Sequence, residues 1–273
     1  MPADTHNEPV PFLVTLLPST DVDLGRWLLQ HYAVSYQERP HAPVFHALAL
    51  KWYGFSADDY PLFVAGVDKI PTIDKLLPYL EARAPAERRL LPEDAALREQ
   101  VIAAGHEYRF GLGGGVVDWA YYNFLPHRRL TSAAFTTGVP WFEKLLVPLA
   151  YPLIRRLMTR ALRLDAAKAE QGLAAVRAGF DRVDAQLADG REFLYGEHLT
   201  YADLAFAAAA APMVLARGYG GHLPSIEEVT PQMQEVMRAL RARPAGAFIQ
   251  QMYDRYRGGA HAAAAAPCSP LEA

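Results

Sequence analysis

The sequence predicts an α+β protein in which a small N-terminal domain with a β-sheet precedes a larger all-α domain. Three observations support this fold class. Short apolar runs alternate with helical patterns over residues 12–83, and no strand pattern recurs after a charged linker. The stretch 193–212 (FLYGEHLTYADLAFAAAAAP) encodes a helix without a polar face, which is typical of the buried centre of a helical domain. A chain of 273 residues is also long enough for two domains.

The N-terminal domain is expected over residues 12–83. Its first strand is the apolar run Phe12–Leu17, and a helix follows over Asp21–Tyr32. The next elements are a strand at 35–39, a weak helix at 41–53, strands at 62–64 and 69–70 joined by a turn, and a helix through residue 80. We expect Pro71 in the first turn of that last helix and Thr72 as its cap. The order ends in an antiparallel hairpin.

The linker 84–92 (APAERRLLP) is charged and contains proline, and the all-α domain is expected over 93–257. Helices are predicted at 94–125, 166–187, 201–211, 230–240 and 244–256. Glycines at 111 and 113–115 would weaken the middle of the first helix, so we expect a close helix contact, a dimer contact or a kink there. The polar segment 1–11 and the low-complexity tail 258–273 are predicted to be disordered.

The helix within 193–212 has two start signals. Thr200 and Asp203 have the spacing of a capping box, in which their side chains satisfy the first free N–H groups of the helix. Leu199 and Leu204 stand where a hydrophobic staple would fix the direction of entry. Pro212 is expected to end the helix.

Composition excludes several classes of function. The net charge of −3 gives no basic excess to neutralise phosphates, so nucleic acid is not an expected partner. The only cysteine, Cys268, lies in the tail, which argues against a disulfide, a thiolate metal cluster or a cysteine nucleophile in the folded body. The histidines have no metal-ligand spacing, and no metal site is expected. Without a secretory signal or an apolar run long enough for a transmembrane segment, a cytoplasmic protein is predicted.

Three sequence motifs and their spacings together resemble those of the cytosolic glutathione transferases, including bacterial members, and the resemblance extends over residues 12–257. The segment Gly196–Asp203 has the form Gly-x-x-Leu-Thr-x-Ala-Asp, Ser19 precedes Arg26 by seven residues, and Pro61 precedes Tyr79-Leu80 by eighteen. The resemblance implies a thioredoxin-like N-terminal domain, an all-α C-terminal domain of the glutathione-transferase type, a homodimer, and glutathione as co-substrate.

Ser19 follows the first strand, at the start of the next helix, where several classes of this family place a catalytic Ser or Cys. A hydroxyl there would donate a hydrogen bond to a bound thiolate, and the helix N-terminus would add positive potential. Lowering a thiol pKa by about two units takes roughly 2.7 kcal/mol. A charge-assisted hydrogen bond provides about 1.5–3 kcal/mol and a helix end about 0.3–1 kcal/mol. Thr20 is the alternative donor, and simple helix capping by either residue stays open.

The resemblance also implies where a peptide would bind. Tyr60-Pro61 matches the family's cis-proline, which would present the backbone of Tyr60 to a peptide-like ligand, although a proline that only starts a strand is the alternative. The family's Glu or Gln followed by Ser is replaced by Thr72 and Ile73. Thr72 with the helix N-terminus would receive a carboxylate, and only Asp74 is left to face an ammonium group.

The helical domain is expected to bind the second substrate. Asp118, Trp119, Tyr121 and Tyr122 fall on the helix that overlooks the thiol in such proteins, with core packing as the alternative for the aromatics. The segment 127–165 resembles an insertion, with apolar runs followed by arginines. It would roof an apolar cavity, touch an anionic membrane surface, or form a buried helix pair with solvated arginines.

The sequence therefore supports three hypotheses about function. The first is transfer of a thiol to an apolar electrophile, or a related glutathione-dependent lyase or isomerase reaction, with Ser19 stabilising the thiolate. The second is a non-catalytic ligand-binding protein on the same scaffold that has lost glutathione recognition at Thr72-Ile73. The third is an enzyme without glutathione that uses Asp118 with Tyr121 or Tyr122 for acid–base work.

Overall fold

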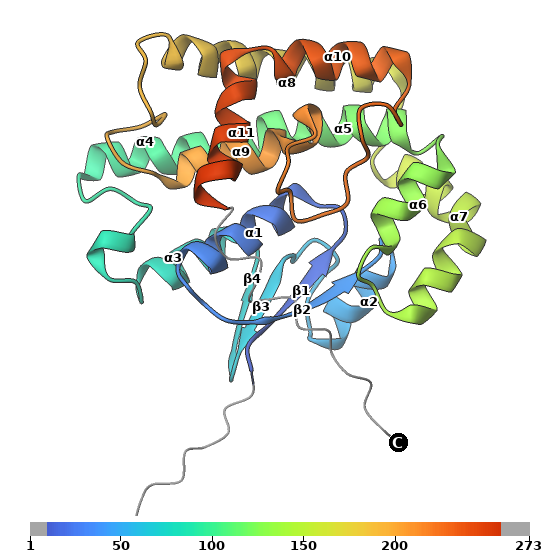
Figure 1. The fold of residues 1–273 in the computed structure, drawn as a ribbon. Coiled ribbons are helices and arrows are strands. Elements are labelled where there is room, and N and C mark those ends of the chain that lie inside the picture. Colours follow the sequence, from blue (N-terminus) through green and yellow to red (C-terminus); the bar gives the residue numbers. More distant parts are fainter. Residues whose placement is uncertain (1–9, 258–273) are drawn as a thin grey trace, which may run out of the picture.

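The computed structural model describes residues 10–257 and has the predicted α+β architecture (Figure 1). A four-stranded sheet with three helices is built from the first part of the chain, and helices alone follow it. Helix α1 (Thr20–His31) lies between the sheet and the helical part, where it packs against α9 (Tyr201–Val214). The predicted disorder of residues 1–9 and 258–273, with Cys268, lies outside the described residues.

The sheet has the strand order β2-β1-β3-β4 of a thioredoxin-like domain. Its strands are β1 (Phe12–Leu16), β2 (Gln37–His41), β3 (Leu62–Ala65) and β4 (Asp68–Pro71). β1 runs parallel to β2 and antiparallel to β3, and β3 and β4 form the predicted hairpin. Besides α1, the helices of this part are α2 (Phe45–Trp52) and α3 (Ile73–Glu81). A short 3-10 turn, η1 (Ala86–Arg88), follows in the linker.

Three local predictions in this part need correction. The second strand begins at Gln37, two residues later than expected, because the Gln37 N–H donates to Pro11 C=O and pairing with β1 starts there. That bond also makes Pro11 part of the ordered fold. Pro71 ends β4 and does not start α3. Thr72 holds the N-cap position, but its side chain accepts no capping bond, because φ of +60° turns the backbone away from the usual cap geometry.

The helical part comprises α4 (Ala95–His106), η2 (Glu107–Leu112, a π-helix), α5 (Gly113–Phe124), α6 (Arg128–Thr136), α7 (Trp141–Ala161), α8 (Ala166–Leu187), α9, α10 (Pro231–Arg241) and α11 (Pro244–Tyr256). The predicted helix at 94–125 is continuous but widens into a π-helix over Glu107–Leu112, directly before the glycines 113–115 of α5. The predicted close contact is present, because a Cβ on Gly115 would lie 2.5 Å from the Gly172 carbonyl oxygen of α8.

Helix α9 is the buried centre of the helical part, as predicted. Thr200 and Asp203 form the capping box, and every residue of Tyr201–Ala211 is buried. Pro212 does not end the helix. α9 continues to Val214 and ends at Leu215, whose φ of +48° is left-handed. Tertiary packing around this helix overrides the cost of an internal proline, which is why the local signal was misleading.

The segment 127–165 forms the helix pair α6 and α7, at the right of Figure 1. The pair packs on the sheet part through an apolar cluster of its own that includes Leu17, Ala42, Phe135, Val147 and Ile154. The buried Glu143 carboxylate adds a polar link, because it accepts from the Ala42 N–H and lies 2.7 Å from His41 Nδ1. The pair therefore extends the helical part down the side of the sheet.

Candidate functional site

Ser19 is the N-cap of α1, where its side chain accepts a long bond of 3.4 Å from the Val22 N–H. α1 comes close to Pro61 because its residue 25 is glycine, and a Cβ there would lie 2.8 Å from Pro61 Cγ. The side chain of Tyr60, the residue before Pro61, lies within hydrogen-bonding reach of Ser19. Burial raises the pKa of the Tyr60 phenol, and a hydrogen bond with Ser19 acts in the opposite direction. Two hydroxyl groups therefore meet at the start of α1.

The peptide bond between Tyr60 and Pro61 is cis, in agreement with the sequence prediction, and the Leu17–Pro18 bond is cis as well. Pro61 C=O accepts from the Thr72 N–H at 3.0 Å, which joins the start of β3 to the start of α3. Within residues 10–257, no hydrogen bond uses the backbone N–H or C=O of Tyr60. This short edge of backbone beside Ser19 is available for pairing with an extended ligand.

At the start of α3, the predicted binding residues Thr72 and Asp74 and the intervening Ile73 have different surroundings. Thr72 is half-buried, and its positive φ is of the kind that clusters at ligand sites. The Ile73 side chain is completely buried in the main core and faces no ligand. The Asp74 carboxylate is 55% exposed and accepts a 2.6 Å hydrogen bond from Arg109 Nη1. Asp74 is thus engaged within the protein, although solvent still reaches it.

Arg109, from the π-helix, is the residue near this site that sequence reasoning missed. Its guanidinium, 2% exposed, makes a two-pronged pair with Asp21 of α1 at 2.9 and 2.8 Å, besides its bond to Asp74. The two carboxylates raise the pKa of Arg109 despite its burial. The ion pairs join α1, α3 and the helical part. No sequence signal identified it, because its partners lie far away along the chain.

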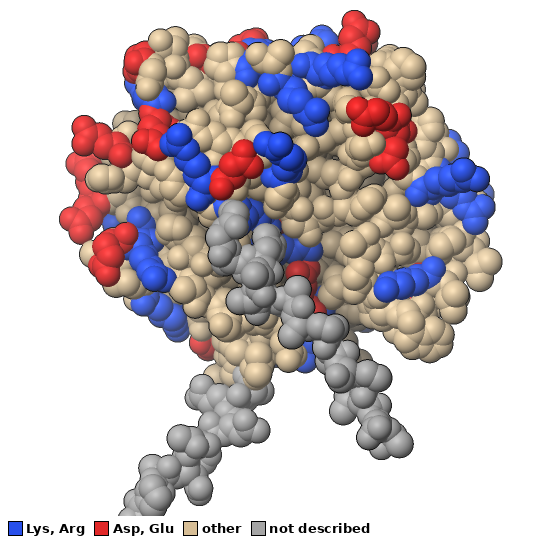
Figure 2. All heavy atoms as spheres, viewed as in Figure 1, with Lys and Arg blue, Asp and Glu red and all other residues tan. Residues whose placement is uncertain are grey.

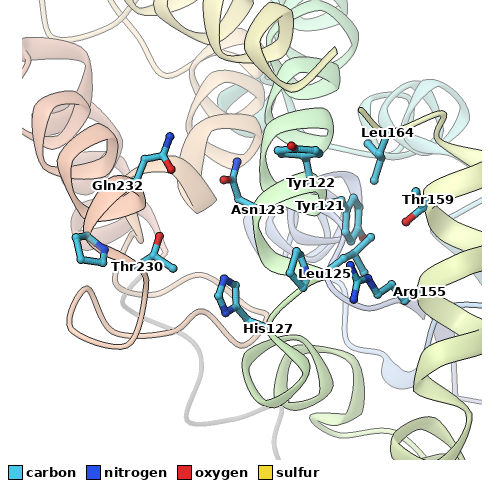
Figure 3. Close-up of a pocket in the computed structure, with 12 residues that line it drawn as sticks. Tyr121, Tyr122, Asn123, Leu125, His127, Arg155, Thr159, Leu164, Thr230 and Gln232 are labelled. Atoms are coloured by element: carbon cyan, nitrogen blue, oxygen red, sulfur yellow. The ribbon is translucent and has the colours of Figure 1, made fainter. Parts of the chain in front are cut away.

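A pocket with a volume of about 640 Å³ lies at the C-terminal end of α5 (Figure 3). The residues that line it are Tyr121, Tyr122, Asn123, Leu125, Pro126, His127, Arg155, Thr159, Leu164, Thr230, Pro231 and Gln232. They come from α5, the turn after it, α7, the segment before α8, and the start of α10. Of the predicted site residues, only Tyr121 and Tyr122 take part.

Tyr121 lines this pocket and lies near Tyr60. Its phenol is buried, which raises its pKa, and the nearby Tyr60 phenol raises it further. The Tyr121 phenol therefore keeps its proton at neutral pH.

The other predicted residues of α5 lie elsewhere. Asp118 faces α8, where its carboxylate is 3.1 Å from Lys168 Nζ, and it does not line the pocket. Trp119 is buried in the main core, so the alternative of core packing holds for it. Tyr122 lines the pocket and is partly exposed to solvent. Of the residues proposed for acid–base chemistry, only the two tyrosines therefore line the pocket.

Arg26, the partner of Ser19 in the sequence register, belongs to a buried polar network. Its guanidinium forms a two-pronged pair with Glu38 of β2. One turn before it, the completely buried Asp23 carboxylate accepts from the Gly220 N–H and from Arg257 and Tyr253. The network fixes α1 against α11. Because Ser19 is the N-cap of α1, the network also fixes the position of Ser19.

Neither a metal cluster nor a membrane span is found among residues 10–257. No group of three or more His, Cys, Asp or Glu side chains could hold a metal ion there. No helix in that range combines the length and apolar character needed to cross a bilayer.

Residues 165–239 match the family model described as glutathione S-transferase, C-terminal domain. No curated protein matches the chain in sequence. Among solved structures, the glutathione transferase GSTFuA3 from Phanerochaete chrysosporium is similar, with a TM-score of 0.60 and 16% identity over 92% of this chain and 98% of its own. A glutathione S-transferase from Methylobacillus flagellatus, solved with glutathione bound, has a TM-score of 0.51 and 16% identity over 88% and 98%.

A third similar structure is a glutathione S-transferase from Sinorhizobium meliloti, with a TM-score of 0.50 and 19% identity over 88% of this chain and 92% of its own. At such identities the likeness concerns the fold, and the C-terminal family match agrees with it. The chain therefore has the fold of the glutathione S-transferases, and its residues 165–239 match their C-terminal domain.

Proposed function

We propose that the protein is a glutathione transferase-like enzyme that transfers the thiol of glutathione to an apolar electrophile. The observation that carries this proposal is the unpaired backbone edge of Tyr60 beside the Ser19 hydroxyl. A peptide that pairs with this edge would place its thiol at the N-terminus of α1. The Ser19 hydroxyl would then donate to the thiolate, with Thr20 as the alternative donor.

The rest of the site supports the same assignment. The first N–H groups of α3, next to Thr72, are suited to a carboxylate of the peptide. The exposed side of the Asp74 carboxylate is the candidate partner of its ammonium group. Tyr121 and Tyr122 would bind the electrophile in the pocket, and Tyr121 would donate to a developing negative charge. The glutathione bound to the similar Methylobacillus flagellatus protein supports this choice of peptide.

A second candidate function is favoured by Ile73 and Asp74. Ile73 is fully buried and Asp74 is paired with Arg109, so two of the family's side-chain contacts to glutathione are absent or weakened. On this hypothesis the protein binds an apolar ligand in the 640 Å³ pocket and no longer uses glutathione. Neither proposal uses Trp119 or Asp118, because Trp119 is buried in the core and Asp118 pairs with Lys168.

Calorimetric titration with glutathione separates the two candidates. Binding at millimolar concentration or tighter is expected for the transferase, and its absence would leave the ligand-binding protein. The thiolate absorbance of bound glutathione then gives its pKa directly. Ser19→Ala should raise that pKa by about one to two units, the equivalent of a charge-assisted hydrogen bond of about 1.5–3 kcal/mol. Thr20→Ala is the matched control, and an equal rise there would reassign the donor.

The resemblance further suggests a homodimer in the cytoplasm. Both are proposals, and sedimentation equilibrium together with fractionation of cells tests them. A monomer at micromolar concentration would contradict the homodimer. Recovery of the protein in neither the cytoplasmic fraction nor the cell-membrane fraction would contradict the cytoplasmic location.

A further inference from the structure

The outward face of α7 is a large apolar surface on the described part of the molecule. One side of this helix is buried, with Glu143, Val147, Tyr151 and Ile154 against the rest of the protein. The opposite side carries seven large apolar side chains whose exposed fractions run from 41% to 77%: Trp141, Phe142, Leu145, Leu146, Leu149, Leu153 and Leu157. We call these seven residues the α7 apolar face. At 100° per residue they occupy one contiguous side of the helix.

The neighbouring helix α2 extends this surface. Phe45 of α2 and Phe142 of α7 are in aromatic contact, with ring centroids 6.3 Å apart. Leu48 and Trp52 follow on α2 at helical spacing, and they are 64% and 87% exposed. Single exposed apolar residues are common on proteins, but a contiguous set of this kind marks an interaction surface.

The charges around this surface are mostly positive, although Asp58 and Asp59 follow α2 and Asp165 follows α7. Residues 127–164 contain seven cations, Arg128, Arg129, Lys144, Arg155, Arg156, Arg160 and Arg163, and a single acid, Glu143. Glu143 does not contribute to the surface, because it is 1% exposed and paired with His41. Residues 42–57, which include α2, contain Lys51 and no acid. Figure 2 agrees, since blue and tan without red cover its right-hand edge, where Figure 1 draws α6 and α7.

The arrangement of α7 matches a helix that lies in a membrane interface. Arg156 and Arg160 follow the leucines on the same side of the helix, and neither makes an ion pair with residues 10–257. Arg128 instead donates a hydrogen bond to Pro148 C=O. This carbonyl lacks its usual helical donor because residue 152 is a proline. An apolar face with flanking arginines binds anionic lipid headgroups while its side chains enter the acyl boundary.

Charge also decides against a second copy of the chain as the occupant. A twofold contact places the same patch on both partners, so the cations of α7 in one copy would face those of the other, and α7 has no exposed acid to pair them. We propose that α7 and α2 dock the protein on an anionic membrane surface, with α7 lying in the plane of the interface. Since Arg155 and Thr159 of α7 line the 640 Å³ pocket, docking also holds that pocket beside the lipid.

Vesicle binding by the full chain tests the proposal. Sedimentation with vesicles of phosphatidylcholine and phosphatidylserine is expected, with at least tenfold weaker binding to phosphatidylcholine alone and weaker binding at high salt. Trp141 and Trp52 should shift their emission to the blue on binding. Leu149→Ser with Leu153→Ser should weaken binding tenfold or more, because both side chains would leave the acyl boundary.

The matched control replaces exposed apolar residues away from α7, with Val67→Ser and Ile102→Ser, which are 96% and 46% exposed. This pair should leave vesicle binding unchanged, and both double variants should keep the wild-type melting temperature because no buried side chain changes. Failure of the wild-type protein to bind anionic vesicles would overturn the proposal. An equal loss in the control pair, or a dimer that dissociates in the Leu149 and Leu153 variant, would overturn it as well.

Discussion

Two adjacent glycines of α5 differ so sharply in their surroundings that they predict opposite effects of the same substitution. A Cβ added to Gly115 would lie 2.5 Å from the Gly172 carbonyl oxygen and 3.2 Å from Ala175 Cβ on α8. A Cβ added to Gly114 would meet nothing within 4 Å. The two positions share a helix and a backbone conformation, so the comparison isolates the contact between α5 and α8.

The magnitude follows from two contributions. Replacing Gly by Ala in a helix stabilises it by about 0.8–1.0 kcal/mol, and this gain applies to both positions. At Gly115 the obstacle is backbone, which cannot rotate away, so the two helices must separate by several tenths of an ångström. Overpacking of this kind typically costs about 1–3 kcal/mol, and the 2.5 Å approach places it at the upper end. The helix gain cancels in the comparison, which leaves a difference of about 3 kcal/mol.

Thermal unfolding followed by circular dichroism measures this difference. Gly114→Ala should raise the melting temperature by a few degrees, and Gly115→Ala should lower it. For a protein of this size, 1 kcal/mol corresponds to roughly 2–4 °C, so the two variants should differ by about 6–12 °C. Melting temperatures within 1 °C of each other, or in the reverse order, would refute the helix contact and reopen a dimer contact or a kink as the role of these glycines.

Two further predictions concern buried carboxylates. Burial raises the pKa of Asp203 to about 6, so the native state holds a proton between about pH 4 and 6 that the unfolded state has lost. The free energy of unfolding should therefore fall as pH rises through that window, and Asp203→Asn should flatten this part of the urea-unfolding profile; identical slopes would count against it. Glu143→Ala should cost about 1–3 kcal/mol in urea because the Ala42 N–H loses its acceptor. Glu143→Gln should cost clearly less, and equal losses would contradict the hydrogen-bond explanation.

The sequence predicted those parts of the fold whose determinants lie close together along the chain. Thr200 and Asp203 are three residues apart, and their capping box forms as expected. Ser19 caps α1 directly after β1, and Pro61 has the cis bond that its register implied. The apolar pattern of α9 predicted burial on all sides, because a helix without a polar face has no side suited to water.

Features that depend on distant partners could not be predicted in the same way. Arg109 binds Asp21 and Asp74, which come from the other part of the chain, and nothing in its local sequence distinguishes it from a solvated arginine. Asp118 has the spacing of a pocket residue, yet Lys168 of α8 turns out to be its partner. Pro212 is a helix terminator by local rules, and tertiary packing carries α9 past it.

The replacement of the family's Ser by Ile73 acquires a different meaning in the structure. The Ile73 side chain of α3 is fully buried against α1, so it contributes to the core. A ligand carboxylate would therefore have to be held by backbone N–H groups, which any residue supplies. On the proposed transferase function, recognition of the ammonium group would depend on Asp74, whose carboxylate already pairs with Arg109. The competition between Arg109 and a ligand ammonium for Asp74, rather than the absence of a serine, is therefore the physical reason to expect weak glutathione binding.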